Sequence, residues 1–178
     1  VAKFINANSE KEIIFVRNTT EALNLLAYTL KPKEVTTTIM EHHSNFVPWQ
    51  QRVMKKDGVF KIWNIDREGK LNLAELDTLI TRRTKVLTIT AASNVLGTIT
   101  PIKKIVAIVK RLNPECLVFV DAAQAVPHMA VSVVDWGADA IAFSGHKMLG
   151  PTGIGVLWAR MSLLSALPPY QYGGDMIE

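Results

Sequence analysis

The stretch SGHKMLGPTGIGVLW, residues 144–158, places one lysine, Lys147, between a Ser-Gly-His step and a glycine-rich turn. The apolar run ADAIAF comes directly before it and is typical of a buried strand. Most single lysines are simply solvated. A lysine between a strand end and a Gly-Pro-Thr-Gly turn is better explained as held in a crevice, where partial desolvation lowers the pKa of its amine. The stretch therefore predicts a nucleophilic amine.

A carboxylate ends a second apolar run, CLVFVDAA, at Asp121. Asp121 could merely cap the residues that follow it. However, a carboxylate that emerges from a buried strand is costly unless it meets a cation. The position therefore favours a charged or protonated partner for Asp121.

Near the start of the chain, Asn18-Thr19-Thr20-Glu21 has the spacing of a capping box. In that interpretation Asn18 or a threonine caps a helix and Glu21 reaches back, and taken alone this is the preferred explanation. The same first turn also offers hydroxyls, backbone N–H groups and the positive end of a helix dipole to a phosphate.

His42 and His43 form a pair that could bind a metal, but no HExxH, CxxC or carboxylate-rich spacing accompanies them. We rank a metal site below a surface histidine and below a ring stacked on a planar ligand.

These residues lie in a chain that alternates strand-like and helix-like segments, which predicts an α/β fold with a mostly parallel sheet covered on both faces. One domain over residues 1–178 is the economical prediction. The expected strands are residues 12–16, 35–39, 59–65, 85–92, 116–123, 138–145 and 153–159. The expected helices are residues 20–30, 46–56, 72–80 and 101–113, with a shorter turn near 131–137.

Ligands of such a sheet bind beyond the carboxyl ends of its strands. Five successive strand ends carry polar residues of different types, so we expect them to converge on one crevice. These segments are RNTTEAL, EHHSN, SNVLGT, DAAQ and SGHK.

Composition excludes several classes of protein. The chain is 48% hydrophobic and 20% charged, which is ordinary for a globular domain. Its formal charge of +4 is scattered rather than clustered, so nucleic acid is not an expected partner. No apolar run approaches membrane-spanning length, so a membrane is not expected either. The single cysteine, Cys116, lies in an apolar run and is expected to be a buried thiol, in keeping with a cytoplasmic protein.

The two ends of the sequence predict a longer polypeptide. The chain begins at Val1 with the helix-like stretch VAKFINA and stops at PPYQYGGDMIE, which has the composition of a loop.

A phosphate cradle, a stacking ring, a carboxylate and a lysine amine together match one cofactor, pyridoxal 5′-phosphate. It needs a lysine for its Schiff base, an acid for the pyridine nitrogen so that the ring acts as an electron sink, and an anion site. Other phosphate motifs do not fit, because GHKM lacks the GK[ST] of a Walker A loop and GPTGIG lacks the GxGxxG spacing.

Five motifs in order, FVRNTTEALN, MEHHSNFVPWQ, ASNVLGTI, VDAAQAVPH and SGHKMLGPTGIGVLW, resemble the class V aminotransferase-related cysteine desulfurases. The form of the motifs favours the group II (Suf-type) branch, with its selenocysteine lyase relatives. The resemblance covers essentially the whole chain. It implies the three-layer sandwich of the large domain of fold-type I pyridoxal-phosphate transferases, here incomplete and without the small C-terminal domain.

The resemblance also implies roles for nine residues. Lys147 matches the Schiff-base lysine that also moves a proton, and His42 matches the ring stacked on the cofactor, with an acid or base role on the substrate. The other matches are Asp121 on the pyridine nitrogen, Gln124 on the ring hydroxyl oxygen, Thr19, Thr20, Ser144 and His146 at the phosphate, and Asn94 near the substrate carboxylate.

The implied reaction converts L-cysteine to L-alanine and leaves a persulfide on an enzyme cysteine, for iron–sulfur cluster assembly through a sulfur-acceptor protein. The family works as a homodimer. Its persulfide cysteine and its substrate-binding arginine lie beyond the end of this chain, and Cys116 matches neither position nor environment. These 178 residues alone are therefore not expected to turn over cysteine efficiently.

Several departures and alternatives stay open. The turn LKPKEV is shorter than the family's, which usually carries Gly-Asp after the proline. A selenocysteine lyase or another class V lyase or aminotransferase is the nearest competing enzyme. A non-catalytic, truncated interaction module is the competing non-enzyme, and the intact Lys147, Asp121, Gln124 and His42 argue against it.

Overall fold

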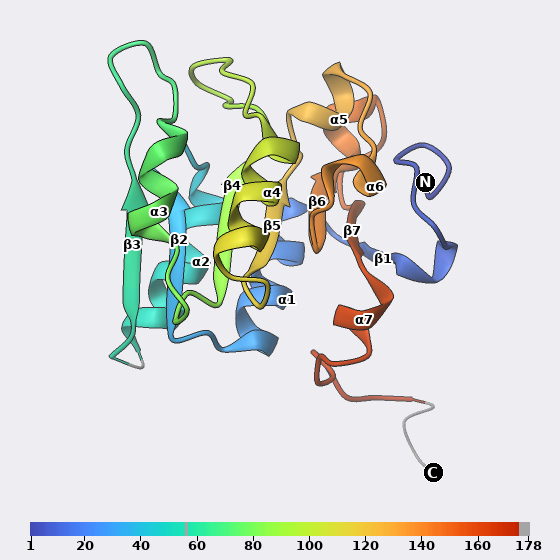
Figure 1. Ribbon diagram of the computed structural model, residues 1–178. Helices are drawn as coiled ribbons and strands as arrows, with labels where there is room; N and C mark the ends of the chain where they lie inside the picture. Colours follow the sequence, from blue (N-terminus) through green and yellow to red (C-terminus); the bar gives the residue numbers. More distant parts are fainter. Residues whose placement is uncertain (56, 175–178) are drawn as a thin grey trace.

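The computed structural model describes residues 1–55 and 57–174, which fold around one seven-stranded sheet with the order β1-β7-β6-β5-β4-β2-β3 (Figure 1). All seven expected strands are present, most of them shorter than expected by one to three residues. Their bounds are β1 Ile13–Val16, β2 Glu34–Thr38, β3 Val59–Trp63, β4 Val86–Thr90, β5 Leu117–Asp121, β6 Ala140–Ser144 and β7 Gly155–Ala159.

The sheet is mostly parallel. Strands β3, β2, β4, β5 and β6 run in the same direction, whereas β7 is antiparallel to both of its neighbours, β6 and β1. Every residue of β2, β4, β6 and β7 is buried, as expected for strands that are covered on both faces. The α/β three-layer prediction is confirmed.

Two long helices, α1 (Thr19–Leu30) and α2 (His43–Met54), cover one face of the sheet. Their buried side chains share an apolar cluster with the sheet, in which the Trp49 and Phe119 rings stack at a centroid distance of 5.6 Å. In Figure 1 these two helices lie behind the strands.

The other face is covered by α3 (Leu76–Leu79), α4 (Ile102–Leu112) and α6 (Val133–Trp136), drawn in front of the sheet in Figure 1. Helix α4 buries Ile102, Ile105, Val106 and Val109, which recur at the spacing of one helix face, and it leaves Lys103 and Lys104 exposed. The prediction of a helix from this pattern is confirmed.

Short elements complete the chain. They are the four-residue helices α5 (Ala125–His128) and α7 (Met161–Leu164) and the 3₁₀ turns η1 (Glu10–Glu12), η2 (Leu73–Glu75) and η3 (Gly145–Met148).

The prediction of an N-terminal helix is wrong, because residues 2–6 form turns. Asn6 adopts a left-handed φ of 52°, which ends the coil after one turn, and Ile5 is fully buried against the core.

Cys116 is fully buried, as expected, and burial raises the pKa of its thiol to about 12. The longest helices of the described residues have 12 residues, and none could cross a membrane. The final stretch of the sequence, 175–178, lies outside the described residues.

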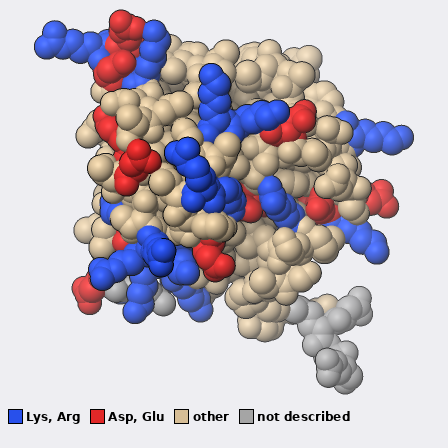
Figure 2. Space-filling view, in the orientation of Figure 1, with Lys and Arg blue, Asp and Glu red and all other residues tan. Residues whose placement is uncertain are grey.

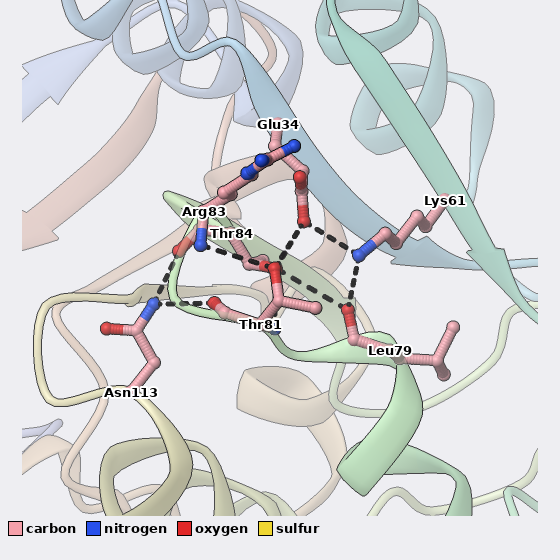
Figure 3. A network of polar contacts seen from close by, with 7 residues as sticks. All are labelled: Glu34, Lys61, Leu79, Thr81, Arg83, Thr84 and Asn113. Carbon is pink, nitrogen blue, oxygen red and sulfur yellow. Dashed lines mark hydrogen bonds and ion pairs between the residues drawn. The ribbon is translucent and has the colours of Figure 1, made fainter.

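A polar network holds the amino ends of β2, β3 and β4 together (Figure 3). One carboxylate oxygen of Glu34 accepts hydrogen bonds from Lys61 Nζ at 2.7 Å and from Thr84 Oγ1 at 2.6 Å. Asn113, which caps the end of α4, donates to the carbonyl oxygens of Thr81 and Thr84 at 2.9 Å each. This end of the sheet is therefore fixed by contacts that are internal to the fold.

Candidate functional site

The opposite end of the sheet, where the parallel strands finish, contains a cavity of about 220 Å³. All five polar segments identified in the sequence reach it, so the predicted convergence is observed. Its lining includes every residue singled out above: Thr19, Thr20, His42, Asn94, Asp121, Gln124, Ser144, His146 and Lys147.

One wall of the cavity is the start of α1. Asn18 Oδ1 accepts a hydrogen bond from the N–H of Glu21 at 2.9 Å, so the capping prediction is confirmed. The Glu21 carboxylate accepts a bond from the Arg17 N–H at 2.6 Å, one residue before the cap. The cap orders the first turn of α1, whose N–H groups lack partners within the helix.

Ser144, at the end of β6, anchors that first turn. Its Oγ accepts a hydrogen bond from the backbone N–H of Thr19 at 2.9 Å and lies 2.7 Å from Thr19 Oγ1. Thr19 and Ser144 are both buried, while Thr20 is exposed beside them. Hydroxyl groups and a helix N-terminus therefore meet at one corner, an arrangement suited to a phosphate.

A second helix begins at the same corner. The ring nitrogen Nδ1 of His42 accepts a hydrogen bond from the N–H of Ser44 at 3.1 Å, so His42 caps α2 with its side chain. Ser44 Oγ lies 2.7 Å from Thr20 Oγ1 and thereby joins the two helix starts. In the neutral ring the proton is then on Nε2, because Nδ1 is the acceptor.

Sequence reasoning missed Ser44 as a site residue, and it placed the start of this helix at Phe46. The signal was available in the spacing of HHSN, where the imidazole of His42 lies two residues before Ser44. A histidine is an uncommon cap, and the usual preference for Ser, Thr, Asp or Asn pointed to later positions.

The floor of the cavity is Asp121, the last residue of β5, whose relative exposure is 4%. One carboxylate oxygen accepts a hydrogen bond from the N–H of Ala123 at 2.9 Å. Burial raises the pKa of Asp121, and the hydrogen bond and the positive fields of Lys147 and His42 act against that rise. A cation in the cavity would relieve the cost of this buried carboxylate.

Lys147 lies in the 3₁₀ turn η3 directly after β6, and its side chain is exposed at the rim. Lys147 lines the cavity from this exposed position, and the expected partial desolvation of its amine stays a prediction. The turn itself is closed by bonds from the N–H of Gly145 to Ile154 O and from the N–H of Gly150 to Gly145 O, at 2.8 and 3.0 Å.

The remaining wall comes from the segments that follow β4 and β5. Gln124, half-buried, precedes α5, and Asn94 is exposed in the loop between β4 and α4. Thr90, at the end of β4, also lines the cavity and was not predicted. It ends a run of β-forming residues, so nothing in its local sequence distinguishes it from a core threonine.

A larger cavity of about 950 Å³ lies at the amino ends of the strands, far from these groups. Its buried carboxylates are committed to ion pairs, Glu34 with Lys61 and Asp139 with Lys110. Figure 2 shows Lys and Arg side chains over most of the drawn face, with a group at its lower left and with Asp and Glu among them. This cavity has amines and guanidinium groups in its lining, but both of its buried carboxylates are already ion-paired, and the hydroxyl groups and paired helix starts of the smaller cavity lie elsewhere.

Comparison with known proteins agrees with the geometry. The chain is 45% identical to a probable cysteine desulfurase of Streptomyces coelicolor, over all of this chain and 44% of that protein. It is also 45% identical to a cysteine desulfurase of Serratia proteamaculans, over all of this chain and 45% of that protein. The chain thus spans less than half the length of these curated relatives.

Solved structures give the same result. The crystal structure of the Escherichia coli cysteine desulfurase CsdA superposes with a TM-score of 0.93 at 32% identity, over 99% of this chain and 45% of that one. The apo cysteine desulfurase of Thermococcus onnurineus superposes with a TM-score of 0.89 at 38% identity, over 99% of this chain and 45% of that one. The family model for class-V aminotransferases matches residues 1–178 from end to end. The chain belongs to the class-V aminotransferase family, whose members depend on pyridoxal phosphate.

Proposed function

We propose that this chain is the cofactor-binding large domain of a pyridoxal-phosphate-dependent cysteine desulfurase. The observation that carries the proposal is the single cavity in which the amine of Lys147, the buried carboxylate of Asp121 and the paired helix starts meet. The relatives named as cysteine desulfurases support the choice of activity within the family.

The residues of the cavity fit the cofactor at three points. Asp121 is a buried carboxylate without an ion pair to a cation among the described residues, and a protonated ring nitrogen would supply one. The corner formed by α1, α2 and Ser144 offers hydroxyls and N–H groups to a phosphate. Lys147 provides the only amine among the residues that line this cavity.

When bound, the cofactor supplies an electron sink for the bonds around the Cα of an amino acid. Lys147 would hold the cofactor and move the proton at the substrate Cα. Asp121 would keep a proton on the ring nitrogen, and His42 would lie against the ring face and act as an acid or base on the substrate.

Four residues would bind the phosphate, and two would orient the ring and the substrate. The phosphate ligands are Thr19, Thr20, Ser144 and His146. Gln124 would donate to the ring hydroxyl oxygen, and Asn94 would lie near the substrate carboxylate.

The proposed reaction breaks the C–S bond of L-cysteine, releases L-alanine and leaves the sulfur on an enzyme cysteine as a persulfide. That cysteine and the arginine for the substrate carboxylate are expected outside these 178 residues. The proposal includes a homodimer that works in the cytoplasm and passes sulfur to an acceptor protein for iron–sulfur cluster assembly. L-selenocysteine is the competing substrate.

Reductive trapping tests the cofactor site directly. The purified protein is incubated with pyridoxal phosphate, its visible absorption is recorded, and it is reduced with borohydride and mapped by mass spectrometry. We expect a pyridoxyl group on Lys147, which is lost in Lys147→Ala and kept in Lys85→Ala, a control at the opposite end of the sheet. Labelling spread over surface lysines would refute the site.

The choice of activity is tested in the full-length protein with L-cysteine and with L-selenocysteine as substrates. Alanine released from L-cysteine, together with a protein-bound persulfide, is the expected result. Turnover of L-selenocysteine alone would assign a selenocysteine lyase instead. A protein that binds the cofactor and releases alanine from neither substrate would refute both assignments.

A further inference from the structure

Ser44 lines the cavity, but the proposed function gives it no role. Its hydroxyl oxygen lies 2.7 Å from Thr20 Oγ1, at the start of α1, and 2.9 Å from Nδ1 of His42, at the start of α2. Its backbone N–H separately donates to the same Nδ1 at 3.1 Å. Ser44 therefore contacts two residues of the proposed cofactor site through two different groups, its hydroxyl and its peptide.

The direction of these hydrogen bonds follows from the number of protons available. A hydroxyl group has one proton to donate and two lone pairs with which to accept, and a neutral imidazole has one acceptor nitrogen. If Thr20 gives its proton to a phosphate, its oxygen must accept the 2.7 Å bond, and Ser44 is its donor within the part of the chain that the structure describes. Nδ1 of His42 still accepts the N–H of Ser44, so both His42 and Thr20 keep a donor.

Exposure and bond strength favour this direction when an anion is present. Thr20 is exposed, whereas Ser44 beside it is half-buried. A hydrogen bond from a hydroxyl group to a charged phosphate is also roughly twice as strong as a bond between two neutral groups. An anion at this corner therefore takes the proton of Thr20, and Ser44 supplies the replacement donor.

A second hydroxyl pair at the same corner has the same form. Thr19 Oγ1 lies 2.7 Å from Ser144 Oγ, which also accepts the N–H of Thr19 at 2.9 Å. In each pair one proton is used between the two oxygens and one is left for an anion. Thr19 and Thr20 are the first two residues of α1, where the helix dipole also favours negative charge.

We propose that Ser44 is a positioning residue of the phosphate corner: its hydroxyl group donates to Thr20 and so leaves the proton of Thr20 for the phosphate of the bound cofactor. This inference rests on the proposed function. The role is separate from the capping of α2, because the N–H of Ser44, and not its hydroxyl group, makes the bond to the capping side chain of His42.

The first test compares two ligands that differ in the phosphate. Ser44→Ala removes the hydroxyl group and keeps the N–H that donates to His42. Binding to the full-length protein is measured with pyridoxal phosphate and with pyridoxal, which has the same ring and aldehyde but no phosphate. We expect the affinity for pyridoxal phosphate to fall about 3- to 10-fold, the effect of one neutral hydrogen bond, and the affinity for pyridoxal to change by less than about 2-fold.

Thr78→Ala is the matched control for the loss of a hydroxyl group. Thr78 is exposed on α3, on the other face of the sheet, and its hydroxyl group donates to the carbonyl oxygen of Glu75 at 2.9 Å. This variant should leave the affinities for both ligands unchanged.

A double-mutant cycle with Thr20→Val separates positioning from direct contact with the phosphate. Valine keeps the branched shape of Thr20 and removes its hydroxyl group. In the Thr20→Val protein we expect Ser44→Ala to cost no further affinity for pyridoxal phosphate, because the hydroxyl group that Ser44 orients is absent. Losses that add in the double variant would overturn the inference, since Ser44 would then act independently of Thr20.

The comparison of ligands has its own refuting results. A Ser44→Ala protein that binds pyridoxal phosphate like the wild type, or that loses affinity equally for both ligands, would show that the hydroxyl group only holds α1 against α2. A wild-type protein that binds pyridoxal phosphate no more tightly than pyridoxal would instead overturn the phosphate corner, and with it the proposed function.

Discussion

Gly155→Ala should weaken phosphate binding at the corner formed by α1, α2 and Ser144, although Gly155 does not line the cavity. The added methyl group would push two backbone segments apart. Gly155 is the first residue of β7 and pairs with Val16 on one side and Ser144 on the other. A Cβ at this position would lie 2.6 Å from the Cα of Asn18 and 2.8 Å from its carbonyl carbon. Asn18 is the cap of α1, so the methyl group would meet the start of the phosphate site.

The size of the effect follows from these distances. Contacts of a real Cβ are ordinary only from 3.4 Å outward, so the backbone at Asn18 must move away by roughly 0.8 Å. A displacement of that size lengthens the bond from the Thr19 N–H to Ser144 Oγ, now 2.9 Å, beyond hydrogen-bonding distance. Overpacking of this kind costs about 1–3 kcal/mol of stability. The same displacement moves Thr19 away from Ser144, the two proposed phosphate ligands, and the loss of one of their hydrogen bonds to the charged phosphate would weaken binding by about 10- to 100-fold.

The assay is a titration of the folded protein with pyridoxal phosphate, followed by visible absorption, with unfolding in urea as the measure of stability. Gly174→Ala is the matched control, because a Cβ there meets nothing within 4 Å. A Gly155→Ala protein that is folded and binds the cofactor with wild-type affinity would show that the corner does not hold the phosphate.

Two further predictions concern buried carboxylates. Replacing Glu34 by Gln removes the partner of Lys61 and should lower the free energy of unfolding in urea by about 1–2 kcal/mol at pH 7. Burial opposes the charge of Glu34, but the hydrogen bonds from Lys61 and Thr84 outweigh burial and lower the pKa of Glu34 below 4.5. The stability that Glu34 contributes is therefore lost as the pH falls through the folded pKa, and the two proteins should have equal stability below it. Asp121→Asn should raise the stability of the cofactor-free protein by about 1 kcal/mol at pH 7, because burial raises the pKa of Asp121 and its charged form destabilises the fold. This gain should vanish in acid, where Asp121 is protonated, and equal stabilities at pH 7 would contradict it.

Much of the fold could be predicted because its strands are short apolar runs rich in β-branched residues and separated by polar turns. The order of the strands and the antiparallel direction of β7 were not predicted, since they depend on pairing between distant segments. The failed N-terminal helix shows the limit of local spacing. VAKFINA has apolar residues at helical intervals, but Asn6 takes a left-handed conformation and the chain turns to bury Ile5.

The residue types of the candidate site could be predicted because each follows a strand, and the carboxyl ends of parallel strands share one edge. Ser44 and Thr90 were not predicted because their places in the site depend on tertiary contacts. The N–H of Thr90 reaches Glu41 only after β2 and β4 have paired, and Ser44 meets Thr20 only when α1 and α2 lie side by side. Local sequence patterns cannot predict these contacts, because each one joins segments that are far apart in the chain.

The pairing of β1 with β7 has a consequence for synthesis on the ribosome. Strand β1 is the first strand of the sheet to emerge, and its only neighbour in the described sheet is β7, the last. Ser144, which anchors the start of α1, also belongs to the late part of the chain, 125 residues after Thr19. At about 5–20 residues per second, the nascent chain waits several seconds or more before these partners appear. The candidate site is therefore assembled only after β6 and η3 have been synthesised, and until β7 follows, β1 lacks its partner in the described sheet.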